Sequence, residues 1–150
     1  MVPDDRRVTR RWSQEQLDRL RAAAPSLLRR LPEVVSAWLY GSALRPGEVG
    51  DLDIALFVRP GDTLSMGDLG RLGRWLQEAS GPQSPELDLR IMRERGAALA
   101  HQVRRTGLLL YGADPAERAW VEARIEGIYL DEGWLRRQAQ TLLGGTPDAA

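Results

Sequence analysis

Residues 39–58 read LYGSALRPGEVGDLDIALFV, in which two apolar segments flank a short loop that contains glycine. The first apolar segment ends in Gly41 and Ser42, and the second begins with Asp51 and Asp53. Because successive side chains of a strand point to opposite faces, these two aspartates project from the same face. The pattern therefore predicts a strand, a loop and a second strand that carries two neighbouring carboxylates.

Two carboxylates held side by side favour a bound cation. At a separation of about 4 Å and an effective dielectric constant near 20, they repel each other by roughly 4 kcal/mol. A cation between them offsets that repulsion, and Mg²⁺ suits a site made of hard oxygen ligands. A third carboxylate, Asp88, belongs to the segment ELDLRI at 86–91, which we interpret as a further strand.

The length and composition are those of a globular domain. The 150 residues are enough to bury a sizeable core, and we expect one domain over 1–150 with flexible ends at 1–12 and 144–150. The sequence has no cysteine, which excludes disulfides and thiolate metal sites. We expect a cytoplasmic protein, because no segment resembles a secretory signal or reaches the ~20 apolar residues of a membrane span.

The charged residues narrow the range of partners. The formal net charge is zero, which argues against direct nucleic-acid binding over a broad basic surface. All 21 basic residues are arginine. A lysine base or a Schiff base is therefore excluded, and any cationic contact to a phosphate must come from arginine.

The periodicity of apolar residues and the helix-capping residues predict alternating helices and strands. The expected helices cover 13–24, 26–31, 65–79, 95–105 and 114–143, and the expected strands cover 34–40, 52–58, 87–91 and 107–111. Pro25 separates the first two helices, because proline cannot donate the hydrogen bond that would continue the first. This order of elements is typical of a mixed β-sheet flanked by helices, in the α/β or α+β class.

The last expected helix carries two apolar rows, whereas a surface helix usually needs one. One row consists of Val121, Ile125, Ile128 and Leu135, and the other consists of Trp120, Gly127, Leu130 and Trp134. Two rows indicate either deep burial of the helix or a surface for a homo- or hetero-oligomer.

The motifs around the aspartates resemble those of the nucleotidyltransferase fold of the DNA polymerase β superfamily. The resemblance rests on Gly41 and Ser42, on the pair Asp51 and Asp53, and on the later Asp88. Within the superfamily the chain is similar to the minimal nucleotidyltransferases (MNT), which act as antitoxins beside HEPN-domain toxins. The likeness covers most of the chain and includes segments 86–91, 104–111 and 114–131.

The resemblance implies a mixed β-sheet with a long C-terminal helix and an ATP-dependent activity. The chain would be the antitoxin of a type VII HEPN/MNT pair and would transfer AMP from ATP to a tyrosine of the HEPN toxin. In the family, aspartates that match Asp51, Asp53 and Asp88 bind Mg²⁺, and the third also helps to activate the incoming hydroxyl. The residues that match nucleotide-binding positions are Gly41, Ser42 and Arg45.

Two departures from the family pattern leave other functions open. The link between Ser42 and Asp51, residues 43–50, is shorter than usual, and Gly50 occupies the position of a family serine. A shorter link can move Ser42 relative to the metal ligands, so one alternative is a non-catalytic antitoxin that acts by binding alone. Another is a nucleotidyltransferase for small molecules of the aminoglycoside type, although the length leaves little room for a substrate domain. Arg45 is equally compatible with an exposed loop charge.

Overall fold

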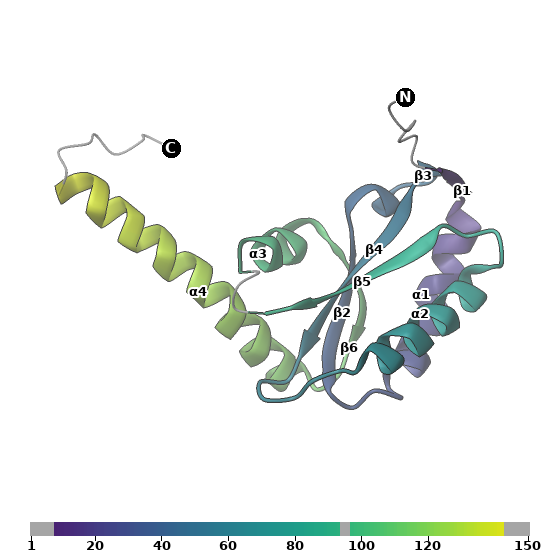
Figure 1. Ribbon diagram of the computed structural model, residues 1–150, viewed down its shortest axis with the longest axis horizontal. Helices are drawn as coiled ribbons and strands as arrows, with labels where there is room; N and C mark the ends of the chain where they lie inside the picture. The colour runs from purple at the N-terminus through teal and green to yellow at the C-terminus, as the bar shows by residue number, and fades with distance from the viewer. Residues whose placement is uncertain (1–7, 94–96, 143–150) are drawn as a thin grey trace, which may run out of the picture.

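The computed structural model describes residues 8–93 and 97–142, and its centre is a four-stranded β-sheet (Figure 1). The strands, in their order across the sheet, are β5 (Glu86–Met92), β4 (Asp51–Val58), β2 (Val34–Tyr40) and β6 (Leu108–Gly112). β2 is antiparallel to both β4 and β6, whereas β4 and β5 are parallel. The mixed sheet expected from the sequence is confirmed.

Helices cover both faces of this sheet (Figure 1). They are α1 (Gln14–Leu28), α2 (Met66–Ser80), α3 (Ala97–Thr106) and α4 (Pro115–Leu142). The first two pack against each other and against one face, and the last two share the opposite face. This layered arrangement confirms the expected α/β (α+β) fold class.

Strand β4 shows how the sequence divides between the two faces. Leu52, Ile54 and Leu56 belong to the core beneath α1 and α2, whereas Ala55 and Phe57 belong to the core beneath α3 and α4. All five side chains are fully buried. The two aspartates at the start of the strand alternate in step with Ala55 and Phe57, so they lie on the α3 and α4 side of the sheet.

Helix α1 starts where the sequence predicts, but it does not end at the predicted residue. The backbone N–H of Gln16 donates to Ser13 Oγ (3.1 Å) and the Ser13 N–H donates to the Gln16 side chain (2.8 Å), which completes a capping box. The expected break at Pro25 is wrong, because α1 continues through this residue to Leu28. Proline removes a hydrogen bond and crowds the preceding turn, but Ala24 and Leu28 on either side of it are fully buried, and this burial favours the continued helix.

A second, two-stranded sheet was not expected from the sequence. It pairs β1 (Arg10–Trp12) antiparallel with β3 (Gly47–Val49), and a 3₁₀ helix, η1 (Gly41–Leu44), precedes β3. We expected residues 1–12 to be flexible, but β1 is part of a sheet and Trp12 is only 1% exposed. Residues 1–7 and 143–150 lie outside the described residues, so the expectation of flexible ends stays a prediction there.

Helix α4 extends past the edge of the sheet (Figure 1). Near its start, Val121 and Ile125 are buried beneath the sheet, whereas Trp120 is 56% exposed. One of the two apolar rows therefore begins in the core and the other begins at the surface. The other apolar side chains of the rows lie outside the described side chains, so an oligomer through this helix stays a prediction.

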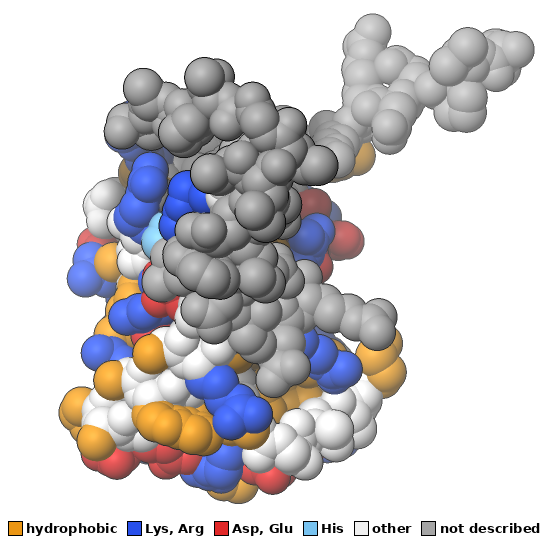
Figure 2. Space-filling model, turned by 90° about the vertical axis from the view of Figure 1, so that its left-hand side faces the viewer, with side chains coloured by type: hydrophobic (Ala, Val, Ile, Leu, Met, Phe, Trp, Pro, Cys, Tyr) orange, Lys and Arg blue, Asp and Glu red, His pale blue; other side chains and the backbone are white. Residues whose placement is uncertain are grey.

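The end of the molecule from which α4 extends carries a mixed surface. Figure 2 shows arginines scattered over this end among acidic, apolar and other side chains. Such a mixture agrees with the zero net charge of the chain. Within the part of the chain that the structure describes, no helix has the length and hydropathy needed to cross a membrane.

Candidate functional site

The register of the strands brings the three predicted carboxylates onto one face of the sheet. Asp53 lies opposite Asp88 on the parallel strand β5 and opposite Tyr40 on β2. Side chains at opposite positions of neighbouring strands share a face, and Asp51 shares it through the two-residue repeat of β4. We call Asp51, Asp53 and Asp88 the aspartate cluster. A fourth carboxylate borders the cluster, because Glu86 lies opposite Asp51.

The aspartate cluster lies where the cover of α3 and α4 ends. Asp51 is exposed, and Asp53 and Asp88 are partly buried. The next side chains of β4 on the same face, Ala55 and Phe57, are fully buried beneath the two helices. The buried part of the strand therefore fixes the positions of the carboxylates, while a substrate can reach them from solvent.

Gly41 joins the first predicted motif to the aspartate cluster. Its φ angle is +76°, a conformation that residues with a side chain rarely adopt. A β-carbon at this position would lie 2.9 Å from Oδ2 of Asp53, which is closer than van der Waals contact allows. The absence of a side chain at Gly41 therefore lets the carboxylate of Asp53 lie against the backbone of the turn.

Ser42 and Arg45 lie at the two ends of the turn that follows Gly41. Both residues are exposed, and the Arg45 N–H donates to the Ser42 carbonyl at 3.5 Å, a long distance for a hydrogen bond. The guanidinium of Arg45 forms no ion pair with any described residue. Both side chains are therefore accessible to a ligand at the surface.

Arg90 is a site residue that the sequence reasoning missed. It follows Asp88 by two positions on β5, so both side chains project from the same face. The Arg90 guanidinium donates to Asp88 Oδ2 at 3.2 Å. The signal that could have found it is the two-residue spacing, which places this cation beside the predicted carboxylate.

Tyr40 is the second missed residue. Its hydroxyl oxygen is buried and forms no hydrogen bond with the described residues. Burial raises the pKa of the phenol above its ordinary value; the Arg90 charge opposes this, and the charges of Asp53 and Asp88 add to it. A neutral phenol therefore lies beside the aspartate cluster. The sequence signal was its place directly before Gly41 at the end of an apolar strand.

The aspartate cluster has the oxygen donors that Mg²⁺ prefers. Among residues 8–93 and 97–142, however, no three acidic or histidine side chains stand close enough together to hold a metal ion. Asp88 instead forms its ion pair with Arg90. The three aspartates therefore offer suitable donors on one face of the sheet, but their described side chains are not gathered around a metal position, and Asp88 is paired with Arg90.

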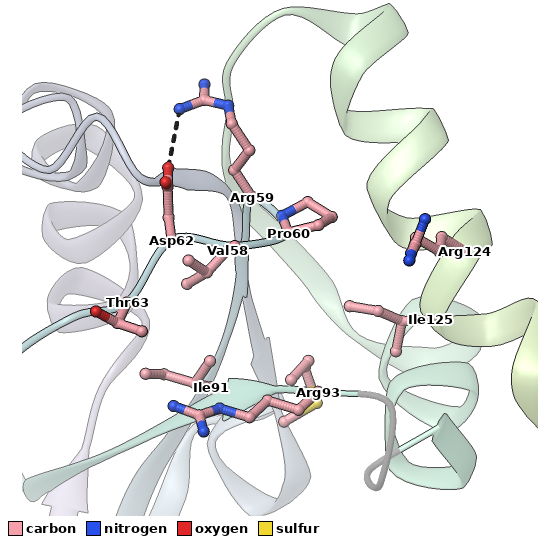
Figure 3. A pocket seen from close by; sticks show the side chains of 11 residues that line it. Val58, Arg59, Pro60, Asp62, Thr63, Ile91, Arg93, Arg124 and Ile125 are labelled. Atoms are coloured by element: carbon pink, nitrogen blue, oxygen red, sulfur yellow. Dashed lines mark hydrogen bonds and ion pairs between the residues drawn. The ribbon is translucent and has the colours of Figure 1, made fainter.

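Two surface hollows lie at opposite ends of β4. One, of about 380 Å³, borders the aspartate cluster and is lined by Val8, Arg10, Gly50, Asp51 and Glu86. The other, of about 290 Å³, lies at the far end, where Val58 and Ile91 line it from the sheet, Ile125 lines it from α4, and Arg59 turns toward Asp62 (Figure 3). Only the first hollow adjoins the predicted carboxylates.

Comparison by sequence and by structure gives different results. No protein-family model matches the chain, and no curated protein matches its sequence. Solved structures do match. One is the complex of a tri-AMPylated HEPN toxin of Shewanella oneidensis with an MNT antitoxin, at 25% identity over 83% of this chain and 93% of that chain, with a TM-score of 0.56.

Two further solved structures agree with the first. One is a toxin–antitoxin complex with AMP-PNP, at 24% identity over 79% of this chain and 93% of that chain, with a TM-score of 0.58. The other is an MntA–HpeT toxin–antitoxin complex with a tyrosine-to-alanine substitution, at 26% identity over 76% and 88% of the two chains, with a TM-score of 0.53. The chain therefore has the fold of the minimal nucleotidyltransferases of HEPN/MNT pairs, and the resemblance carried by its motifs is confirmed.

Proposed function

We propose that this chain is the MNT antitoxin of a type VII HEPN/MNT pair and that it transfers AMP from ATP to a tyrosine of its HEPN toxin. The observation that carries the proposal is the meeting of two motifs, since Gly41 lies against Asp53, and Asp53 lies opposite Asp88. The similar complexes support it, because one contains a tri-AMPylated HEPN toxin and another contains AMP-PNP. Because the reaction consumes ATP, we expect it to take place in the cytoplasm.

The reaction forms a phosphodiester and breaks a phosphoanhydride. The tyrosine oxygen bonds to the α-phosphorus of ATP, the bond from that phosphorus to the β-bridging oxygen breaks, and pyrophosphate leaves. The tyrosine proton passes to a base, and we assign this role to the carboxylate of Asp88. Such a transfer depends mainly on positioning and on neutralisation of charge rather than on covalent chemistry by the protein.

The other predicted residues would bind the nucleotide. The aspartate cluster would hold Mg²⁺, which supplies positive charge to the triphosphate. Ser42 would donate a hydrogen bond to a phosphate oxygen, and Gly41 lets the backbone come close to the nucleotide. The exposed Arg45 can bind a phosphate through two parallel hydrogen bonds.

Mass spectrometry of the toxin tests the proposal. The chain is incubated with its HEPN partner, ATP and Mg²⁺, and the intact mass of the toxin is measured. We expect the mass to rise in steps of one AMP on a tyrosine. The double variant Asp51→Asn/Asp53→Asn should give no rise, because it removes the charges of the aspartate cluster on β4.

A matched variant controls for the loss of two negative charges. Asp18→Asn/Asp62→Asn changes the net charge equally at exposed positions of α1 and of the turn after β4. This variant should modify the toxin at the wild-type rate. A toxin that stays unmodified by the wild-type chain, or that the Asp51→Asn/Asp53→Asn variant modifies normally, would contradict the proposal.

Neutralisation by binding alone is the second candidate function. The observation that favours it is the ion pair of Asp88 with Arg90, which occupies a carboxylate that catalysis requires. The Asp51→Asn/Asp53→Asn variant separates the two candidates in cells that express the toxin. Growth protected by this variant supports neutralisation by binding, whereas growth arrest despite an intact complex supports AMP transfer.

A further inference from the structure

Trp12 binds the turn that follows the first motif, although it lies far from that turn in the sequence. Its side chain is 1% exposed and packs in the same core as Ala43, Val49 and Leu52. The indole Nε1–H donates to the carbonyl oxygen of Ala43 at 2.9 Å in a buried hydrogen bond. This carbonyl belongs to η1, one residue after Ser42.

The strand that carries Trp12 also holds the other end of the same link. β1 pairs with β3 along its length, with Trp12 opposite Gly47 and Arg10 opposite Val49. Gly50 alone separates β3 from Asp51, the first residue of β4. One three-residue strand therefore fixes both ends of the shortened connection between Ser42 and the aspartate cluster.

The hydrogen bond that ends the turn is long. The Arg45 N–H to Ser42 carbonyl distance is 3.5 Å, and 3₁₀ hydrogen bonds have poor geometry even at shorter distances. Because the peptide group is planar, the hydrogen bond from Trp12 fixes the orientation of the whole Ala43–Leu44 peptide. η1 also packs against β2 and β4, and the indole from outside the motif adds a directional contact to that packing.

We infer that Trp12 is a positioning residue for ATP: its indole N–H holds η1 so that Ser42 and the backbone of Gly41 meet the phosphates beside the aspartate cluster. The inference rests on the proposed function and adds to it a residue outside the family motifs. Trp12 touches neither the nucleotide nor the acceptor tyrosine. Its loss therefore weakens the binding of ATP, while binding of the toxin and the chemical step are preserved.

The test compares two Trp→Phe variants for binding of AMP-PNP with Mg²⁺ and for AMP transfer. Trp12→Phe keeps an aromatic ring but removes the donor to Ala43. Trp38→Phe on β2 is the matched control, because the Trp38 Nε1 has no hydrogen-bond partner among the described residues. In Trp12→Phe we expect Kd for AMP-PNP and KM for ATP to rise about tenfold, because the variant loses one buried hydrogen bond. The values of kcat and of KM for the toxin should stay within about twofold of the wild type. Trp38→Phe should bind AMP-PNP as the wild type does.

A second variant covers the case in which Trp12→Phe does not fold. Replacing Trp12 with 3-benzothienylalanine puts sulfur in place of the N–H and keeps the size of the ring, and it should raise Kd as Trp12→Phe does. Wild-type affinity for AMP-PNP in this variant or in folded Trp12→Phe would overturn the role of Trp12 and leave the proposed function intact. An equal loss of affinity in Trp38→Phe would do the same. Failure of the wild-type chain to bind AMP-PNP would instead overturn the proposed function, and the inference with it.

Discussion

A β-carbon on Gly41 would lie 2.9 Å from the Oδ2 atom of Asp53, so the two motifs of the site are in direct steric contact. The φ angle of +76° at Gly41 adds a second restriction, because it favours glycine whatever the surroundings. Any side chain at position 41 must therefore strain the turn and displace a carboxylate of the aspartate cluster. Sequence patterns alone give the glycine and the aspartate but not this contact.

Gly41→Ala is expected to reduce AMP transfer about 100-fold, because a small displacement of reacting groups has a large effect on rate. The positive φ angle should also lower the free energy of unfolding by about 1–2 kcal/mol. Gly61→Ala is the matched control, since Gly61 has φ +87° but nothing within 4 Å of its β-carbon position. Equal loss of activity in both variants would show that backbone strain, not the contact with Asp53, is responsible.

Arg90→Gln is expected to lower the Mg²⁺ concentration required for half-maximal AMP transfer. The Arg90 guanidinium lies 3.2 Å from Asp88 Oδ2 and competes with a cation for this carboxylate. Since exposed ion pairs contribute about 0.2–1 kcal/mol, the shift should be about 1.4- to fivefold. It is measured by titrating Mg²⁺ at saturating ATP.

The control for Arg90 is Arg71→Gln, which removes an arginine that pairs with Asp68 on α2. This variant loses the same charge on the other side of the sheet, so its Mg²⁺ requirement should match that of the wild type. A higher Mg²⁺ requirement in Arg90→Gln would contradict competition. It would indicate instead that Arg90 helps to bind the nucleotide.

The strands of the site were predictable from their apolar residues, which are nearly continuous at 34–40 and at 54–58 and alternate with charged residues at 86–91. The strand at 34–40 has the expected bounds, the strand at 52–58 gains one residue at its start, and the strand at 87–91 gains one residue at each end. The two-residue repeat also placed Asp51 and Asp53 on one face. It could not place Asp88 beside Asp53, because the register of two strands is set by their ladder of hydrogen bonds in space.

The elements that were missed are short or depend on distant partners. β1 and β3 have three residues each, too few for a periodic pattern, and each is completed only by the other. The break expected at Pro25 rests on the local effect of proline, whereas α1 continues through this residue to the buried Leu28. Arg90 and Tyr40 escaped notice because their importance comes from contact with the aspartate cluster, which is not a sequence property.

Glu122→Gln is expected to lower the free energy of unfolding by about 3 kcal/mol, as measured by urea denaturation. Glu122 is 2% exposed and lies 2.7 Å from Arg104 Nε and 3.6 Å from Arg118 Nε, so it neutralises two arginines between α3 and α4. Removing its charge leaves Arg118 without this counter-ion and leaves Arg104 paired with Glu126 alone. A loss below about 0.5 kcal/mol, the range of exposed pairs, would contradict this role.

The control for Glu122 is Glu15→Gln on α1. Glu15 also pairs with an arginine, Arg19, at 2.6 Å, but its side chain is 74% exposed. Solvent screens such a pair, so its loss should change the free energy of unfolding by less than about 0.5 kcal/mol. Comparing the two variants separates the effect of burial on the free energy of unfolding from the effect of losing an ion pair.

Tyr40 is expected to make the protein less stable at alkaline pH. Its pKa in the folded chain lies above the ordinary value of 10.0, mainly because burial disfavours the phenolate. The unfolded chain therefore loses the phenol proton first as the pH rises. By linkage, the stabilisation from the protonated phenol is complete below pH 10 and is lost as the pH rises through the folded pKa.

The composition of the chain makes the effect of Tyr40 at alkaline pH simple to measure. The sequence contains neither lysine nor cysteine, so tyrosines are the side chains that titrate between about pH 9 and 12. Urea denaturation of the wild type and of Tyr40→Phe at pH 8 and pH 11 isolates Tyr40, because Tyr111 and Tyr129 are common to both proteins. The wild type should lose more stability than Tyr40→Phe over this interval. An equal loss in the two proteins would mean that the Tyr40 phenol ionises as easily in the folded chain as in water, and that its burial beside the aspartate cluster has no energetic effect.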